Sequence, residues 1–220
     1  MHVAELWRYP VKSMAGERLR EVNLTALGVD GDRIVHVENA RGRVVTARTH
    51  PKLLGHRAVL DAQGEPLVDN RAWRDPSVTA DIEHVVGSGA RLVLDNGGGQ
   101  FDILPLLVAT DGAITAFGYD GRRLRPNLVI GGVEGLAERT WEGKNLRIGD
   151  VLIALEDLRG RCVMTTFDPD TLAQDHRVLQ SIVDRFNGRL ALNAAVVRGG
   201  HVREGDRVEL IEARRRSQHQ

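Results

Sequence analysis

Short apolar runs that end at glycines or polar turns recur along the whole chain, and they constrain its fold more than any other feature. The 220 residues contain 24 glycines. This punctuation is typical of strands joined by tight turns. Residues 33–38 and 43–47 flank a polar turn and predict one hairpin, and residues 58–60 and 66–68 predict a second. We therefore expect a mainly β fold, beginning with a small antiparallel barrel or sandwich.

Two segments instead show helical periodicity. Four apolar residues near residues 78–86 recur at helical spacing, with Ser77 as the expected N-cap and Gly87 at the end. A second helix is expected near residues 175–187. Its apolar stripe comprises Val178, Leu179, Ile182, Val183 and Phe186. Both helices are expected to pack against the strands through these stripes, and further strands are expected at 3–7, 91–94 and 103–109.

The glycine run at residues 97–99 does not match a phosphate-binding loop. Such a loop ends in Gly-Lys-Ser/Thr and opens a helix, whereas Gln100 and Phe101 follow here. A turn is the expected structure. Gly149-Asp150 and Gly205-Asp206 are likewise expected to be turns that enter strands.

The overall charge excludes one class of function. Thirty basic residues balance thirty acidic ones, whereas a nucleic-acid-binding surface usually brings a basic excess. No apolar run is long enough for a membrane span, and the N-terminus has no secretory signal pattern. We expect a cytoplasmic protein with neither nucleic acid nor a membrane span among its partners.

Cys162 is the single cysteine, so an internal disulfide is excluded. Arg161 precedes it and Arg159 lies three residues before it, and nearby cationic charge favours a thiolate, which binds soft metals or attacks electrophiles. A lone cysteine can also be a small buried hydrophobe. No local signature supports a Cys–His nucleophile pair, with His176 the nearest downstream histidine. The scattered histidines do not supply a tetrahedral zinc site.

Five segments together resemble the MOSC family, named for the C-terminal domain of molybdenum cofactor sulfurase. The order and spacing are similar to those of the branch that carries an N-terminal MOSC barrel domain and includes the amidoxime-reducing components and their bacterial relatives. The segments are Tyr-Pro-Val-Lys-Ser at 9–13, Gly-Val-Asp-Gly-Asp-Arg at 28–33, Val-Thr-Ala-Arg at 45–48, Arg-Pro-Asn at 125–127 and the Cys162 segment with Thr-Thr-Phe-Asp-Pro-Asp-Thr at 165–171.

The resemblance implies a MOSC-type β-barrel with peripheral helices and an intimately packed N-terminal β-barrel subdomain. It implies residues 1–88 as the N-terminal domain, 89–213 as the MOSC domain and 214–220 as a flexible tail. It also implies a bound pyranopterin molybdenum cofactor, with Cys162 as the thiolate ligand to molybdenum. The residues expected to hold the cofactor are Lys12, Ser13, Arg33, Arg48, Thr110, Arg125, Asn127, Arg161 and Cys162.

Two classes of activity follow from the resemblance. In the first, the protein is an oxidoreductase that reduces the N–O bond of a small N-hydroxylated compound, with electrons from a separate flavin or iron–sulfur protein. In the second, it is a carrier of the cofactor or of sulfur without substrate turnover. No aminotransferase-like lysine domain accompanies the motifs, so pyridoxal phosphate binding is not expected. A barrel that has lost its ligand is a third interpretation. Asp168 and Asp170 either shape the loop after Cys162 or face a substrate, and the sequence leaves both open.

Overall fold

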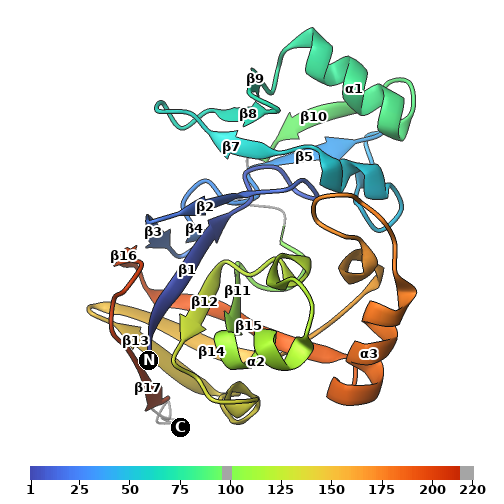
Figure 1. The fold of residues 1–220 in the computed structure, drawn as a ribbon. Helices are drawn as coiled ribbons and strands as arrows, with labels where there is room; N and C mark the ends of the chain where they lie inside the picture. Colours follow the sequence, from blue (N-terminus) through green and yellow to red (C-terminus); the bar gives the residue numbers. More distant parts are fainter. Residues whose placement is uncertain (96–100, 214–220) are drawn as a thin grey trace, which may run out of the picture.

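The protein consists of two lobes stacked one above the other (Figure 1). The computed structural model describes residues 1–95 and 101–213. The turn expected at residues 97–99 and the expected tail at 214–220 lie outside the described residues. None of the helices in the described ranges is long and apolar enough to cross a membrane.

The lower lobe is built on an eight-stranded mixed sheet with the strand order β17-β13-β14-β15-β11-β12-β1-β2. Neighbouring strands pair antiparallel, except that β11 and β12 run parallel. The strands are β1 (His2–Arg8), β2 (Glu17–Leu19), β11 (Leu106–Thr110), β12 (Leu128–Gly131), β13 (Lys144–Ile148), β14 (Val151–Gly160), β15 (Arg189–Arg198) and β17 (Val208–Glu212). A three-stranded sheet, β16 (Gly200–Arg203), β3 (Glu21–Thr25) and β4 (Gly28–Val29), lies beside it.

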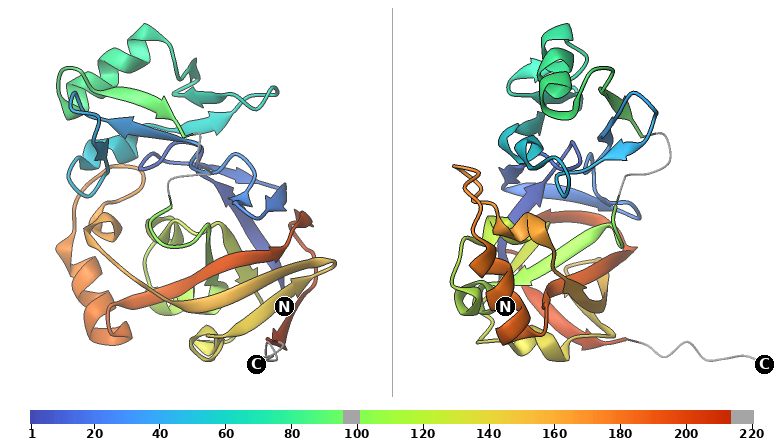
Figure 2. Two further views of the ribbon diagram at one scale, coloured as in Figure 1. Left: turned by 180° about the vertical axis from the view of Figure 1, so that it is seen from behind. Right: turned by 90° about the vertical axis from the view of Figure 1, so that its right-hand side faces the viewer.

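The upper lobe contains two small antiparallel sheets and one helix (Figure 2). The first sheet joins β10 (Arg91–Leu94), β5 (Val35–Glu38) and β6 (Val44–Val45). The second joins β7 (Ala58–Leu60), β8 (Pro66–Val68) and β9 (Arg71–Ala72). Helix α1 (Pro76–Val86) and the 3₁₀ helix η1 (Pro51–Gly55) complete the lobe. Both hairpins expected from the sequence, β5 with β6 and β7 with β8, are therefore confirmed.

Helices α2 (Asp111–Phe117) and α3 (His176–Phe186) flank the lower lobe, together with the 3₁₀ helices η2 (Gly121–Leu124), η3 (Ala137–Thr140) and η4 (Val163–Thr166). The apolar stripe expected on α3 is largely confirmed, because Val178, Ile182 and Phe186 are buried against α2 and its surroundings. Val183 is an exception, with 48% of its surface exposed, because it lies one position beyond the buried face.

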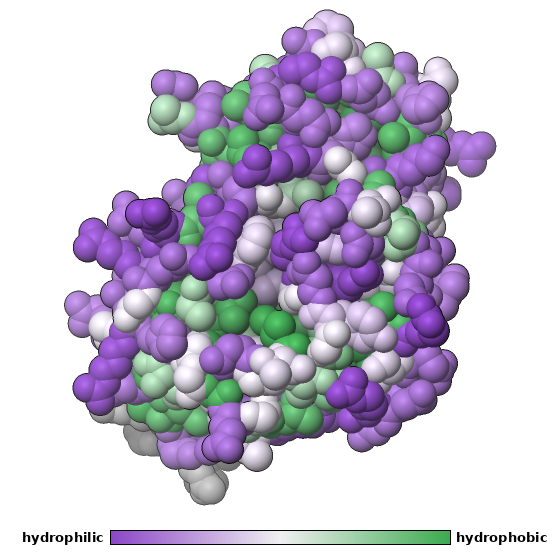
Figure 3. Space-filling model, in the orientation of Figure 1, coloured by the Kyte–Doolittle hydropathy of each residue, from purple (hydrophilic) through white to green (hydrophobic). Residues whose placement is uncertain are grey.

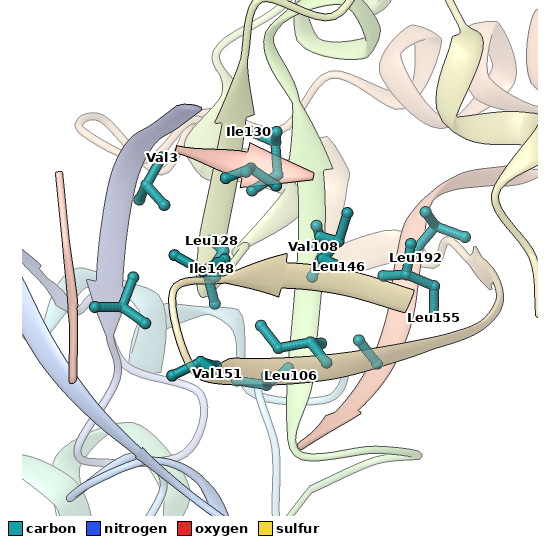
Figure 4. Close-up of a cluster of buried hydrophobic side chains, with 14 of the residues drawn as sticks. Val3, Leu106, Val108, Leu128, Ile130, Leu146, Ile148, Val151, Leu155 and Leu192 are labelled. Carbon is teal, nitrogen blue, oxygen red and sulfur yellow. The ribbon is translucent and has the colours of Figure 1, made fainter. Parts of the chain in front are cut away.

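The main core lies on the inner face of the large sheet. Apolar side chains from strands near both ends of the chain meet there, including Val3, Leu128, Leu146 and Leu192 (Figure 4). A second core fills the upper lobe. The face of the molecule in Figure 3 is mostly hydrophilic and is hollowed between the two lobes. Because β1 runs from the lower sheet towards the upper lobe, the N-terminal segment joins the two.

The expected mainly β fold of the MOSC type with peripheral helices is confirmed, and the large sheet of its lower lobe is open instead of forming a closed barrel. Its edge strands β17 and β2 do not pair with each other within the described residues. The sheet curls until the amides of Gly205 and Val208 donate to the carbonyls of Val3 and Met1 at 2.8 and 3.0 Å. These bonds form only at one corner, because the preceding strand β16 leaves to pair with β3. The lobe is therefore a curled mixed sheet.

Local details also differ from the sequence predictions. The N-cap of α1 is Asp75, whose carboxylate accepts from the Ser77 amide at 2.8 Å, because Pro76 occupies the first helical position, where a missing N–H costs nothing. Strand β11 begins at Leu106, after Pro105, instead of at residue 103. Strand β10 lies beyond the expected boundary after residue 88 and pairs with β5 of the upper lobe. The two domain ranges remain predictions.

Candidate functional site

A pocket of about 410 Å³ lies at the junction of the two lobes. The elements around it are the segment after β1, the segment after β6, the residues before β11, η2, and the end of β14. Eight of the nine residues expected to hold a cofactor line this pocket: Lys12, Ser13, Arg33, Arg48, Arg125, Asn127, Arg161 and Cys162. Residues as far apart in the sequence as Lys12 and Cys162 are thus brought together.

Cys162 follows β14 and directly precedes η4, so its side chain stands at a sharp change of chain direction. Its carbonyl accepts from the amide and the hydroxyl of Thr165, at 3.0 and 2.8 Å, which fixes the backbone after the thiol. The thiol is free and only partly buried. Its backbone is therefore held rigidly while the sulfur remains available to a ligand.

Arg48 is the cation most directly associated with Cys162. Burial lowers the pKa of Arg48, but the neighbouring Cys162 sulfur and the Asp102 carboxylate outweigh burial and raise the pKa above its ordinary value. The guanidinium therefore stays charged beside the sulfur. A fixed cation at this position suits an anionic ligand or a thiolate.

Asp102 is an acidic residue of the pocket that was not anticipated from the sequence. Its carboxylate pairs with Lys12 at 2.7 Å, Arg48 at 2.5 Å and Arg159 at 3.2 Å. Burial raises the pKa of Asp102, but the hydrogen bond from Lys12 and the charges of the two arginines outweigh it, so the pKa lies below its ordinary value. Asp102 is accordingly ionised and neutralises part of the cationic lining.

Arg125 and Arg161 differ from the other cations because, among the described residues, neither forms an ion pair with a carboxylate. Burial lowers the pKa of each to about 10. Arg125 packs over the Tyr9 ring, with 4.3 Å from its guanidinium carbon to the ring centroid, and Arg161 donates to the Leu124 carbonyl at 2.7 Å. Arg125 Nη2 and Arg161 Nε are nevertheless buried with no hydrogen-bond partner among the described residues. Such groups are costly to bury unless a ligand accepts from them.

Asn127 and Arg33 line the pocket but have structural partners. Asp32, which is buried, pairs with Arg33 and accepts from Asn127 Nδ2 at 3.1 Å and from the Tyr9 amide at 2.6 Å. Asn127 Oδ1 in turn accepts from the Leu107 amide at 3.2 Å. Its amide group is therefore largely committed to the fold, which leaves it little capacity for a ligand.

Ser13 and Thr110 occupy contrasting positions. Ser13 has a left-handed backbone, with φ of 72°, and its hydroxyl oxygen accepts from the Ala47 amide at 3.0 Å while lining the pocket. Thr110 does not line the pocket. Its hydroxyl caps α2 by accepting from the Ala113 amide at 3.1 Å, and it also contacts Glu138 at 3.3 Å. The structure thus places Thr110 at a helix terminus, apart from the other eight residues.

Two further arginines hold the loop that follows Cys162. Arg123 donates to the carboxylate of Asp168 at 2.9 Å and to the Thr165 carbonyl at 3.3 Å. Arg122 pairs with Asp170 through two bonds of 2.8 and 2.6 Å. Asp168 also accepts from the amides of residues 170 and 171, so it shapes this loop. The sequence carries a signal for these two ion pairs, because adjacent arginines at 122–123 can match the two aspartates of the Cys162 segment.

The described residues contain no cluster of three or more histidine, cysteine, aspartate or glutamate side chains that could hold a metal ion. Any metal in the pocket would therefore have to bring most of its ligands with it. The donor set of the pocket, one thiol surrounded by cations with unpaired N–H groups, suits a soft metal carried by an anionic organic group.

Comparisons with known proteins agree with this architecture. The MOSC N-terminal beta barrel domain matches residues 1–93, and the MOSC domain matches residues 113–209. The mitochondrial amidoxime reducing component 2 of Homo sapiens is 28% identical over 233 residues, covering 80% of this chain and 69% of the relative. The human component 1 is 26% identical and covers 77% and 67%. The YuaD protein of Bacillus subtilis superposes with a TM-score of 0.54 at 12% identity, covering 97% of this chain and 96% of YuaD, which shows the fold alone.

The chain therefore belongs to the MOSC-domain proteins, a class associated with molybdenum cofactor binding. Within that class it has the two-part form, in which a MOSC N-terminal beta barrel domain precedes the MOSC domain. The family resemblance expected from the five sequence segments is confirmed.

Proposed function

We propose that this protein binds the pyranopterin molybdenum cofactor in the lobe-junction pocket and reduces the N–O bond of small N-hydroxylated compounds. The observation that carries the proposal is the combination of a free thiol with two buried, unpaired arginine N–H groups in one pocket. The similarity to proteins named as amidoxime-reducing components supports the choice of substrate class.

The residues present fit such a cofactor. The Cys162 thiolate is a soft ligand, which molybdenum bound by sulfur accepts readily. Arg125 Nη2 and Arg161 Nε offer donors to the phosphate or the pterin, and Lys12 and Ser13 lie on the same pocket. Arg48 would compensate the negative charge beside the sulfur. Asn127 and Arg33 would contribute indirectly, through the Asp32 network that forms one side of the pocket.

When bound, the cofactor supplies two-electron redox chemistry. The net reaction needs two electrons and two protons to convert an N–OH group into N–H and water, with electrons delivered by a separate flavin or iron–sulfur protein. The chain's own residues orient the reactants. Because Asp102 is held ionised by Lys12 and the arginines, it accepts hydrogen bonds at neutral pH and does not act as the proton donor. Protons must therefore reach the pocket from solvent.

The first test is the molybdenum content per chain of wild type and Cys162→Ser, purified side by side from a host that makes the cofactor. We expect near-stoichiometric metal in wild type and little in the variant, with equal melting temperatures for the two metal-free chains. Wild-type chain without molybdenum would refute cofactor binding. A loss of stability in the metal-free variant would instead indicate that Cys162 serves packing.

Turnover separates the reductase from a carrier. With a simple N-hydroxylated compound and an artificial reductant, the loaded wild type should consume many equivalents per chain. Consumption that stops at one equivalent would contradict the reductase assignment and favour a carrier of cofactor or sulfur.

A further inference from the structure

A second cavity of about 460 Å³ adjoins the Cys162 pocket. Arg123, Arg125 and Met164 line both, so these side chains form a wall common to the two spaces. The rest of the second cavity comes from β1, β2 and the residues before it, the end of η1 and the residues after it, η2, and the loop after η4. Neither the Cys162 thiol nor Lys12, Arg48 or Asp102 lines it, so it is a separate compartment.

The lining of this second cavity carries an excess of positive charge. Five arginines line it against one acidic residue, Asp170. Asp170 is already engaged, because it pairs with Arg122 through two hydrogen bonds. Arg18 pairs with Glu204 at 3.0 Å. Arg57 is an exposed residue, and its guanidinium has no ion-pair or hydrogen-bond partner within residues 1–95 and 101–213.

Arg123 adds a buried donor to the cavity. Only 9% of its side chain is exposed, and its terminal nitrogens are taken by Asp168 and Thr165. Its Nε is buried without a hydrogen-bond partner in the described part of the chain. A buried guanidinium N–H without an acceptor is a costly feature that an anionic ligand would relieve. Arg123 therefore favours an anion in this cavity, and the positive charge of the exposed Arg57 adds to the attraction.

The remaining lining is apolar and partly aromatic: Trp7, Leu54, Met164, Phe167 and Pro169. Trp7 stacks on Tyr9 at 6.5 Å between ring centroids, and its indole N–H donates to Glu5 at 2.7 Å. With its N–H occupied, Trp7 offers mainly ring surface to a ligand. Aromatic and apolar walls with a few polar groups are typical of sites for small organic molecules.

We propose that this second cavity binds a small aromatic anion, a carboxylate or a phosphate ester on a single ring. The ring would lie against Trp7 and Phe167, and the anionic group would accept from Arg57 and Arg123. The site shares the wall formed by Arg123, Arg125 and Met164 with the Cys162 pocket, but it does not use Cys162.

Tryptophan fluorescence of the full metal-free chain provides the test, with benzoate and phenyl phosphate as probes. Trp7 lines the cavity. Trp73 and Trp141 do not line it, and they are buried, with 6% and 4% of their surface exposed. We expect saturable quenching by at least one probe. Benzamide, which has the ring without the charge, and acetate, which has the charge without the ring, should each bind at least tenfold more weakly. The tighter of the two anions identifies the preferred anionic group.

Variants assign the binding to this cavity. Arg57→Gln should weaken binding severalfold, and Trp7→Phe should abolish the fluorescence change. Arg74→Gln, at an exposed arginine of the upper lobe, and Cys162→Ser should both leave the affinity unchanged. Because the Cys162→Ser chain is expected to lack molybdenum, retained probe binding there separates this proposal from the proposed function. Equal affinity for benzoate and benzamide, an unaffected Arg57→Gln variant, or no saturable binding of either anion would overturn the proposal.

Discussion

Two groups of buried polar side chains lie next to each other in the lobe junction and differ in whether their hydrogen bonds are complete. Around Asp32, the partners Arg33, Asn127 and the Tyr9 amide satisfy the carboxylate. Arg125 and Arg161, which line the same pocket, each keep a buried N–H without an acceptor in residues 1–95 and 101–213. A completed network stabilises the fold, whereas an incomplete one costs stability until a ligand completes it. The comparison separates residues whose hydrogen bonds stabilise the pocket from residues that we propose bind its ligand.

The largest expected effect is on the completed network. Asp32→Ala removes the acceptor for one charged and two neutral donors, and it should lower the free energy of unfolding by about 3–5 kcal/mol. Urea denaturation of the metal-free chain measures this. Asp30→Ala, two residues earlier and exposed, is the matched control and should change little. If both variants lose a similar free energy of unfolding, the hydrogen bonds of Asp32 contribute no more to stability than the exposed Asp30 does.

The next effect concerns Arg125, which has an unpaired buried N–H in the described part of the chain. Its substitution should change cofactor retention more than the free energy of unfolding. Arg125 has a left-handed backbone, with φ of 56°, so Arg125→Asn changes the side chain without straining the turn. The stability of the metal-free chain should change by less than about 1 kcal/mol, because removing a buried unpaired charge offsets the lost contact with Tyr9.

Cofactor retention, in contrast, should fall. Loss of a charge-assisted bond costs about 1.5–3 kcal/mol, or roughly tenfold or more in affinity. Molybdenum per chain, measured after competition with metal-free wild type, reports this loss. If the Arg125→Asn chain is destabilised but keeps its molybdenum, Arg125 stabilises the fold and does not bind the cofactor.

Much of this arrangement can be predicted from the sequence where the signal is local. The hairpins of the upper lobe follow from alternating runs around polar turns, and α3 follows from its apolar stripe. The pocket residues carried by the five family segments also meet, because these segments are connections and strand ends that the fold gathers at one junction.

The non-local features could not be predicted from the sequence. Asp102 meets Lys12, Arg48 and Arg159 only after the segment before β11 folds against both lobes. The open edge of the large sheet likewise depends on where β16 pairs, which strand alternation does not encode. Thr110 ends a strand, as pocket residues often do, but the chain turns directly into α2 there and the hydroxyl caps that helix. Hydrogen bonds between segments distant in the sequence decide each of these cases.

Glu138 tests whether an incomplete buried group always points to a ligand. It lies in η3, fully buried beside Thr110, and its Oε1 has no partner among the described residues. No residue of either cavity contacts it through a hydrogen bond in the described chain, so we expect it to be a cost to stability alone. Of the substitutions at Asp32, Arg125 and Glu138, the one at Glu138 should therefore have the smallest effect.

Burial raises the pKa of Glu138, partly countered by hydrogen bonds from its own amide and Thr110. The folded chain therefore favours the protonated acid. The contribution of this carboxyl to stability is complete below its ordinary pKa of 4.5 and is lost as the pH rises through the higher pKa of the folded chain. Glu138→Gln resembles the protonated acid at every pH. Its advantage over wild type in the free energy of unfolding should be near zero at pH 4 and reach about 1 kcal/mol at pH 8, measured by urea denaturation. Glu134→Gln, at an exposed position nearby, should show no such change with pH. If the Glu138 advantage is the same at both pH values, the carboxyl does not titrate between them, and the incomplete bond at Oε1 must be satisfied by something other than a proton.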